Sequence, residues 1–137
     1  DRRIALSYGD VQFQGTSVDE ELYVRYDLGR TYGPFQPALG ASVTGRGDAW
    51  VGIGATWTAH LADTGIYTQL HLMPGFYAQG SGPDLGHAVE FRSGAEIGYQ
   101  ANNGMRFGIS YDHRSNAELS STNPGLETLQ FRVSFTF

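Results

Sequence analysis

Apolar and polar residues alternate along most of this chain, with the period of two that is typical of β-strands. Residues 66–76 show it clearly, because the even positions from Ile66 to Phe76 are almost all apolar, whereas the odd positions include Gln69 and His71. The alternation recurs in eight segments, most of them separated by turn-forming residues. We predict strands over residues 2–13, 21–29, 35–43, 51–59, 66–76, 89–99, 105–115 and 126–137.

The two faces of these strands differ, and the face that forms the core decides the class of barrel. One face is steadily apolar, and the other collects charges. A soluble, lipocalin-like barrel would place the apolar face inside, whereas a membrane barrel places it outside against lipid. The even strand count, the glycines on the charged face and the terminal Phe137 favour the membrane barrel. We therefore predict an all-β fold, an eight-stranded antiparallel transmembrane β-barrel of the outer-membrane type. The charged positions are Arg25, Asp27, Glu90, Arg92, Glu96, Arg106, Asp112 and Arg132.

Composition narrows the function without naming it. The 137 residues fit one domain, residues 1–137. The absence of cysteine excludes disulfides and thiolate metal sites, and the net charge of −5 argues against a nucleic-acid partner. The chain starts at Asp1 without a charged and apolar leader, so an exported form is expected to have lost its signal peptide.

Several polar and aromatic residues have predicted structural roles. We expect Arg106 to pair with Asp112 or Glu96 inside the barrel, and Arg92 to pair with Glu90 or Asp27. The histidines outside the last two strands lack ligand spacing, so no metal site is predicted. Aromatic residues near strand ends are typical of interfacial girdles. These aromatic residues are Trp50, Trp57, Tyr77, Tyr99 and Tyr111.

The last two strands bring reactive residue types together. His113 and Ser115 share the apolar face of residues 105–115, and Glu127 lies on the apolar face of residues 126–137. If Ile109 pairs with Phe131, the same register places His113 opposite Glu127. Opposed residues have Cβ atoms roughly 4.5–5.5 Å apart, so a carboxylate at Glu127 can orient the imidazole. With both termini on the periplasmic side, these three residues would lie at the outer rim and face lipid.

Two short motifs in this region carry a resemblance to a known family. They are His113-x-Ser115-Asn116-Ala117-x-Leu119 and Asn123-x-Gly125-x-Glu127. Together they resemble the lipid A 3-O-deacylase (PagL-type) family, while the upstream chain corresponds only in its eight-strand pattern. The chain departs from the expected motif at Glu118, where a small residue such as glycine is expected.

The resemblance implies an outer-membrane serine esterase that removes the 3-O-linked acyl chain from lipid A of lipopolysaccharide. It implies Ser115 as nucleophile, His113 as base and Glu127 as orienter, with no cofactor. The expected oxyanion donors are the Asn116 side chain and backbone N–H groups around Asn123 and Gly125. The partners are then lipopolysaccharide and outer-membrane lipids, a homodimer is left open, and the site lies at the outer leaflet.

Near the predicted rim, Arg46 and Arg114 are candidates to meet lipid A phosphates on charge and position alone. Three alternatives stay open. The first is a non-enzymatic, structural outer-membrane barrel with an inert loop motif. The second is the soluble lipocalin-like barrel, and the third is a membrane enzyme that transfers a palmitoyl chain instead of hydrolysing an ester.

Overall fold

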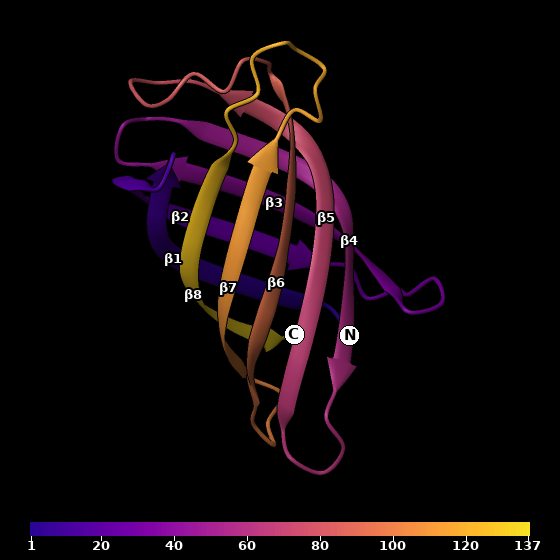
Figure 1. Cartoon of the computed structure of the whole chain (residues 1–137). Helices are drawn as coiled ribbons and strands as arrows, with labels where there is room; N and C mark the ends of the chain where they lie inside the picture. Colours follow the sequence, from indigo (N-terminus) through magenta and orange to yellow (C-terminus); the bar gives the residue numbers. More distant parts are fainter.

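The structure is a computed structural model that describes every residue from Asp1 to Phe137, and it is built from eight β-strands (Figure 1). The chain contains no helix long and apolar enough to cross a membrane. The strands are β1 (Arg3–Phe13), β2 (Thr16–Asp27), β3 (Phe35–Thr44), β4 (Ala49–His60), β5 (Ile66–Ala78), β6 (Val89–Gln100), β7 (Arg106–Ser115) and β8 (Leu126–Thr136).

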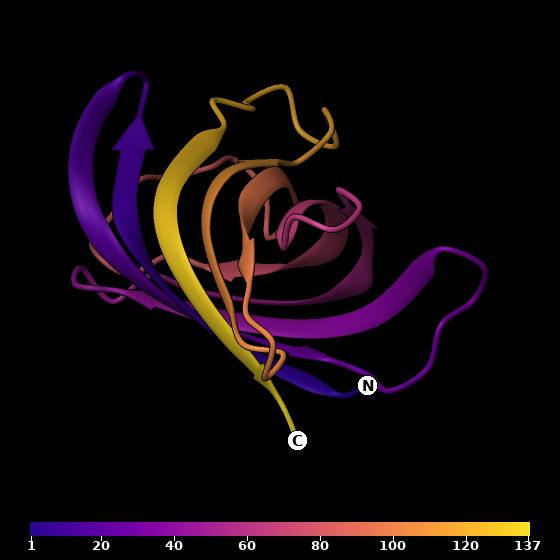
Figure 2. The same ribbon diagram turned by 90° about the horizontal axis from the view of Figure 1, so that it is seen from below.

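The strands form a closed antiparallel barrel in chain order, which confirms the predicted fold class. Closure comes from β1 pairing with β8, with Arg3 opposite Thr136. Because these residues lie at the ends of the chain, both termini lie at one end of the barrel, as Figures 1 and 2 show. We call the opposite end, where β1–β2, β3–β4, β5–β6 and β7–β8 connect, the distal end.

The barrel is polar inside and apolar outside. Large apolar side chains such as Ile53, Leu72 and Phe131 are more than half exposed on the exterior, whereas buried polar and charged residues outnumber buried hydrophobic ones. This distribution is the reverse of a soluble barrel and matches the membrane type. It excludes the lipocalin-like alternative, which requires apolar residues lining the interior.

The charged interior is held by ion pairs within a strand, between neighbouring strands and across the lumen. Arg25 pairs with Asp27, Arg132 pairs with Glu96, and Arg92 pairs with both Glu21 and Asp112. The prediction that Arg92 pairs with Glu90 or Asp27 was therefore wrong. The prediction that Arg106 pairs with Asp112 or Glu96 was also wrong, since Arg106 donates to Gln100. Strand alternation predicts which face a charge occupies, but its partner across the lumen depends on the rotation of distant strands.

The aromatic residues divide between the two faces. Trp57, Tyr99 and Tyr111 are about half exposed on the exterior, as expected for an interfacial girdle. Trp50 and Tyr77 are buried in the interior, so their predicted place in that girdle was wrong. Strand alternation explains why Trp50 points into the barrel, because the apolar exterior of β4 runs through the odd positions. Glycines leave room for its ring: a Cβ at Gly52 or Gly75 would come within about 2.6 Å of it.

The β1–β2 hairpin is longer than the sequence pattern predicts. β2 starts at Thr16 instead of at residue 21, because the mostly polar residues 16–20 continue the pairing with β1 beyond the apolar repeat. A two-residue turn joins the strands, with positive φ at Gln14 and Gly15. Such turns match the twist of paired strands, which explains how the hairpin extends so far.

Candidate active site

The strands β7 and β8 present the predicted catalytic residues on the barrel exterior at the distal end. The register pairs Ile109 with Phe131 and places His113 opposite Glu127, which confirms the predicted pairing. Because side chains alternate, His113 and Glu127 point outward, while the neighbouring Arg114 is buried. The sequence-predicted register therefore places an imidazole and a carboxylate side by side on an apolar surface.

His113 and Glu127 are in direct contact. Nδ1 of His113 lies 2.5 Å from Oε2 of Glu127, and their side chains are 48% and 25% exposed. A proton on Nδ1 is donated to the carboxylate, which fixes the ring and leaves Nε2 as the free basic nitrogen. The contact also provides Glu127 with a partner on a surface where an unpaired carboxylate would be costly.

Ser115 lies two residues beyond His113, at the end of β7, and is partly buried. Residues two apart on a strand have Cα atoms about 6.6 Å apart, a span that an imidazole leaning along the strand can cover. The structure shows no hydrogen bond between Ser115 and His113. Catalytic hydrogen bonds are often long without substrate and shorten in the substrate complex, so Ser115 stays a candidate at this distance.

Gly125 lies directly against the His113 ring. Its φ is +76°, in the left-handed region that favours glycine, and a Cβ there would lie 2.9 Å from Cε1 of His113. The same Cβ would lie 3.7 Å from Oε2 of Glu127. A glycine at this position thus allows the loop to turn and leaves space for the histidine–carboxylate pair.

The side chain of Asn116 has a different role from the one predicted. It is fully buried, and its Nδ2 donates to Leu85 O at 3.2 Å and to Thr122 O at 2.7 Å. Both amide hydrogens are thereby used, which contradicts the prediction that this side chain donates to an oxyanion. The reason is alternation: Asn116 follows the outward Ser115, so it points inward.

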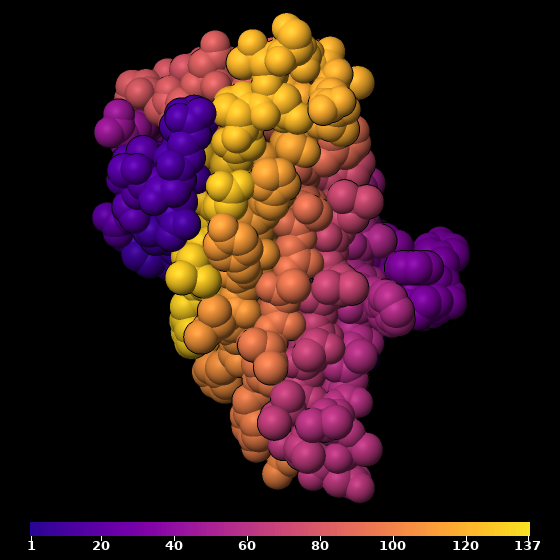
Figure 3. All heavy atoms as spheres, viewed as in Figure 1, coloured from indigo at the N-terminus to yellow at the C-terminus, as the bar shows by residue number.

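Two further contacts order the β7–β8 loop. Oδ1 of Asn123 accepts the backbone N–H of Asn116 at 3.0 Å. The β5–β6 loop packs beside it, since Leu85 is buried and a Cβ at Gly86 would lie 2.0 Å from Thr122 O. Figure 3 shows the two loops adjacent at the distal end, at the top of the view. The sequence pattern did not predict this support, because loop residues carry no periodic signal.

The departure at Glu118 has a structural counterpart. Ala117 and Glu118 have φ values of +52° and +63°, in the left-handed region. Oδ1 of Asn116 accepts the backbone N–H of Glu118 at 2.9 Å and stabilises the turn. A small residue such as glycine was expected at position 118, and the backbone conformation there is one that glycine adopts without strain.

The two arginines predicted to lie near the rim differ in their exposure. Arg46 is exposed in the β3–β4 turn, where its Nε donates to Val18 O. Arg114 is 1% exposed and pairs with Glu21 in the lumen, so the prediction that it meets lipid phosphates was wrong.

Comparison with known proteins decides the family. The family model described as "Lipid A 3-O-deacylase (PagL)" matches residues 7–136. The chain belongs to this PagL family. The assignment makes the protein a carboxylic ester hydrolase of the bacterial outer membrane, as predicted. No curated protein sequence matches the chain.

Solved structures support the fold. The crystal structure of the outer membrane enzyme PagL superposes with a TM-score of 0.78 at 16% identity, covering 98% of this chain and 99% of that one. A de novo designed transmembrane β-barrel superposes with a TM-score of 0.68 at 7% identity, covering 98% of this chain and 92% of that one. Neisserial surface protein A superposes with a TM-score of 0.59 at 9% identity, covering 99% of this chain and 96% of that one. At these identities the likeness concerns the barrel alone.

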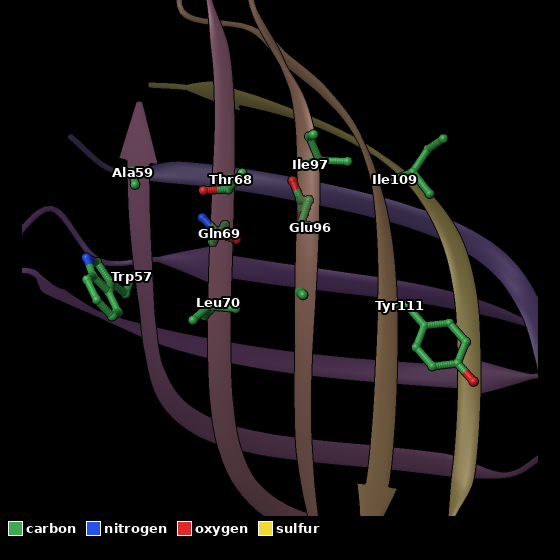
Figure 4. A pocket seen from close by; sticks show the side chains of 10 residues that line it. Trp57, Ala59, Thr68, Gln69, Leu70, Glu96, Ile97, Ile109 and Tyr111 are labelled. Atoms are coloured by element: carbon green, nitrogen blue, oxygen red, sulfur yellow. The ribbon is translucent and has the colours of Figure 1, made fainter. Parts of the chain in front are cut away.

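An apolar hollow of about 560 Å³ lies on the exterior of this PagL-family barrel (Figure 4). It runs across β4, β5, β6 and β7, and the small Ala95 opposite Tyr111 contributes to its depth. Tyr111, at one edge of the hollow, precedes His113 by two residues on the same face, and the hollow extends from Tyr111 toward the termini. Its lining consists of Trp57, Ala59, Thr68, Gln69, Leu70, Ala95, Glu96, Ile97, Ile109 and Tyr111.

Proposed function

We propose that this barrel hydrolyses the ester that links an acyl chain to position 3 of lipid A, and that Ser115, His113 and Glu127 carry out the reaction at the outer rim. The observation that carries the proposal is the contact between His113 and Glu127 beside a serine on the apolar exterior. An ester embedded in the outer leaflet approaches such a site from the bilayer without entering the barrel.

The chemistry proceeds in two steps. The Ser115 oxygen attacks the ester carbonyl as His113 Nε2 takes its proton, and the tetrahedral intermediate collapses when His113 protonates the departing sugar oxygen. Water then attacks the acyl-serine with His113 again as base, which releases the hydroxy fatty acid and restores Ser115. Glu127 holds the ring through Nδ1 and stabilises the imidazolium that forms in each step.

The oxyanion requires donors other than the Asn116 side chain. Pro124 has no N–H, so within residues 123–125 the backbone donors that we propose are those of Asn123 and Gly125. Gly125 supports this assignment because its backbone already lies against His113. Asn116 becomes a positioning residue that holds the loop carrying these donors.

The apolar hollow supports lipid as the substrate class. A charged or soluble ester would gain nothing from a surface lined by Leu70, Ile97 and Ile109, whereas an acyl chain would bury apolar area there. We propose that the hollow accepts a lipid A acyl chain while the ester lies at Ser115.

The test is the mass spectrum of lipid A from Gram-negative cells that express the protein. Wild type is expected to remove one hydroxyacyl chain, and Ser115→Ala is expected to leave lipid A intact. Unchanged lipid A with folded wild type would favour the structural barrel, and a gain of mass would favour palmitoyl transfer. Loss of the chain that persists in Ser115→Ala would reject the proposed nucleophile.

A further inference from the structure

Directly behind the catalytic face, two arginines lie side by side in the lumen. Arg92 of β6 and Arg114 of β7 are paired in register, and both are at most 1% exposed. Opposed residues on one sheet face have Cβ atoms roughly 4.5–5.5 Å apart, and like charges in that arrangement are destabilising. Burial strengthens the repulsion because little water screens it.

Glu21 resolves this conflict from the other side of the lumen. It comes from β2, is 1% exposed, and lies 2.7 Å through Oε1 from Arg92 Nη2 and 2.8 Å through Oε2 from Arg114 Nη2. One carboxylate therefore binds both guanidinium groups. Arg92 also pairs with Asp112 at 2.7 Å, so the cluster holds two arginines and two carboxylates.

The members of this cluster alternate with the candidate catalytic residues. Asp112 and Arg114 flank His113, and Arg114 directly precedes Ser115. Nη2 of Arg114 also donates to Oγ1 of Thr128, the residue after Glu127, at 3.3 Å. Each catalytic side chain on the exterior thus neighbours a residue tied to the inner cluster.

We propose that Glu21 is a positioning residue for the reaction: by holding Arg114 and Arg92, it fixes the β7 backbone from which His113 and Ser115 project. It touches neither lipid nor the reacting atoms, because the barrel wall separates it from them. The inference rests on the proposed role of Ser115.

The decisive variant is Glu21→Gln, which keeps the side-chain size and removes the charge. The two arginines then repel each other, and the backbone between His113 and Ser115 shifts. A displacement on the order of 1 Å costs about 100-fold in rate, so we expect kcat to fall by roughly 10- to 100-fold. KM is expected to stay near the wild-type value, because Glu21 makes no contact with the lipid.

Asp27→Asn is the matched control. Asp27 is also a fully buried carboxylate paired with an arginine, Arg25, but it lies at the end of β2 nearer the termini. Loss of this pair weakens the barrel without touching β7. We expect Asp27→Asn to lower the thermal stability of the purified protein in detergent and to leave kcat unchanged.

Labelling of Ser115 by an alkyl fluorophosphonate separates this inference from the choice of substrate. In the folded wild-type barrel, we expect a Ser115 adduct by peptide mass spectrometry, formed at least tenfold more slowly in Glu21→Gln than in Asp27→Asn. Equal labelling rates in the three proteins would overturn the role of Glu21. Wild type that labels at Ser115 but leaves lipid A intact would contradict the proposed substrate and not the role of Glu21.

If Glu21→Gln does not fold, the double variant Glu21→Gln/Arg114→Gln replaces it, because it removes the like-charge pair while Arg92 keeps Asp112. We expect this variant to fold and to label at least tenfold more slowly than wild type, because β7 has lost the ion pair through which Glu21 holds Arg114. A folded double variant that labels at the wild-type rate would reject the inference.

Discussion

The two faces of the β7–β8 pair differ in how their polar groups are held. On the exterior, His113 and Glu127 are partly exposed and bind mainly each other. On the interior, Asp112 and Arg114 are 1% exposed, and each contacts more than one partner. The same backbone therefore carries an accessible pair on one side and a buried cluster with several contacts per residue on the other.

This difference separates the residues that we propose to react from those that hold the backbone in place. A residue that reacts must meet substrate, so the exterior groups keep free positions such as Nε2 of His113. A residue that positions must not move, and a buried group with several hydrogen bonds is costly to displace. We therefore expect exterior substitutions to reduce rate with little effect on folding, and interior ones outside the cluster of Glu21, Arg92, Asp112 and Arg114 to reduce stability instead.

The largest expected effect follows from Ser115→Ala or His113→Ala. Each removes a group that takes part in bond making or proton transfer, so we expect kcat to fall by roughly 10⁴-fold or more while the barrel stays folded. Hydroxy fatty acid release from purified lipopolysaccharide measures the rate.

Ser134→Ala is the interior counterpart. Ser134 is buried on β8 and accepts a hydrogen bond from Arg3, so its loss should cost about 1 kcal/mol of stability and no rate. The comparison of the two faces fails if Ser115→Ala unfolds the barrel or if Ser134→Ala abolishes turnover.

Glu127→Gln is expected to lower kcat less than Ser115→Ala does, so that its kcat stays roughly tenfold or more above that of Ser115→Ala. The amide keeps a contact with His113 but no longer stabilises the imidazolium. Parallel rate measurements under one set of conditions check the order. A Glu127→Gln enzyme as inactive as Ser115→Ala would indicate that the carboxylate does more than orient.

Gly125→Ala should lower kcat by roughly 10- to 100-fold, because the new methyl group would lie 2.9 Å from His113 Cε1 and displace the ring. Gly104→Ala is the control for backbone strain. Gly104 has φ +88°, and a Cβ there would meet only Thr136 Oγ1 at 3.5 Å, at the end near the termini. Equal rates for the two variants would show that contact with His113 is unimportant.

The smallest effect is expected for Glu118→Gly. Its φ of +63° strains a side chain, so glycine should stabilise the loop by up to about 1 kcal/mol. Resistance of the β7–β8 loop to proteolysis reports this gain. Gln14→Gly, at φ +52° in the distant β1–β2 turn, should leave that loop unchanged. A less resistant loop in Glu118→Gly would assign the glutamate a role of its own.

Strand alternation predicted much of this molecule, because one rule places every side chain on a face. It predicted the eight strands and their apolar exterior, and the hairpin register inferred from the sequence alone placed His113 against Glu127. The same rule, applied one residue beyond Ser115, would have placed Asn116 inside the barrel. The error on Asn116 came from following the motif instead of the period.

Other features depend on contacts that no local period encodes. Glu21 binds Arg114 across the lumen, and the barrel's closure sets that distance. The contact of Leu85 with Asn116 joins two loops whose residues follow no repeat. Trp50 could have been placed inside by counting from the apolar exterior of β4, but its position near a strand end suggested a girdle residue instead.

The central claim is that Ser115 cleaves a lipid A ester from the lipid-facing side of the barrel. The most direct test uses purified protein, lipopolysaccharide in detergent and quantified release of hydroxy fatty acid, with Ser121→Ala as a control for an exposed serine in the same loop. We predict release by wild type and Ser121→Ala and none above background by Ser115→Ala. Release by a folded Ser115→Ala barrel at the wild-type rate would contradict the claim.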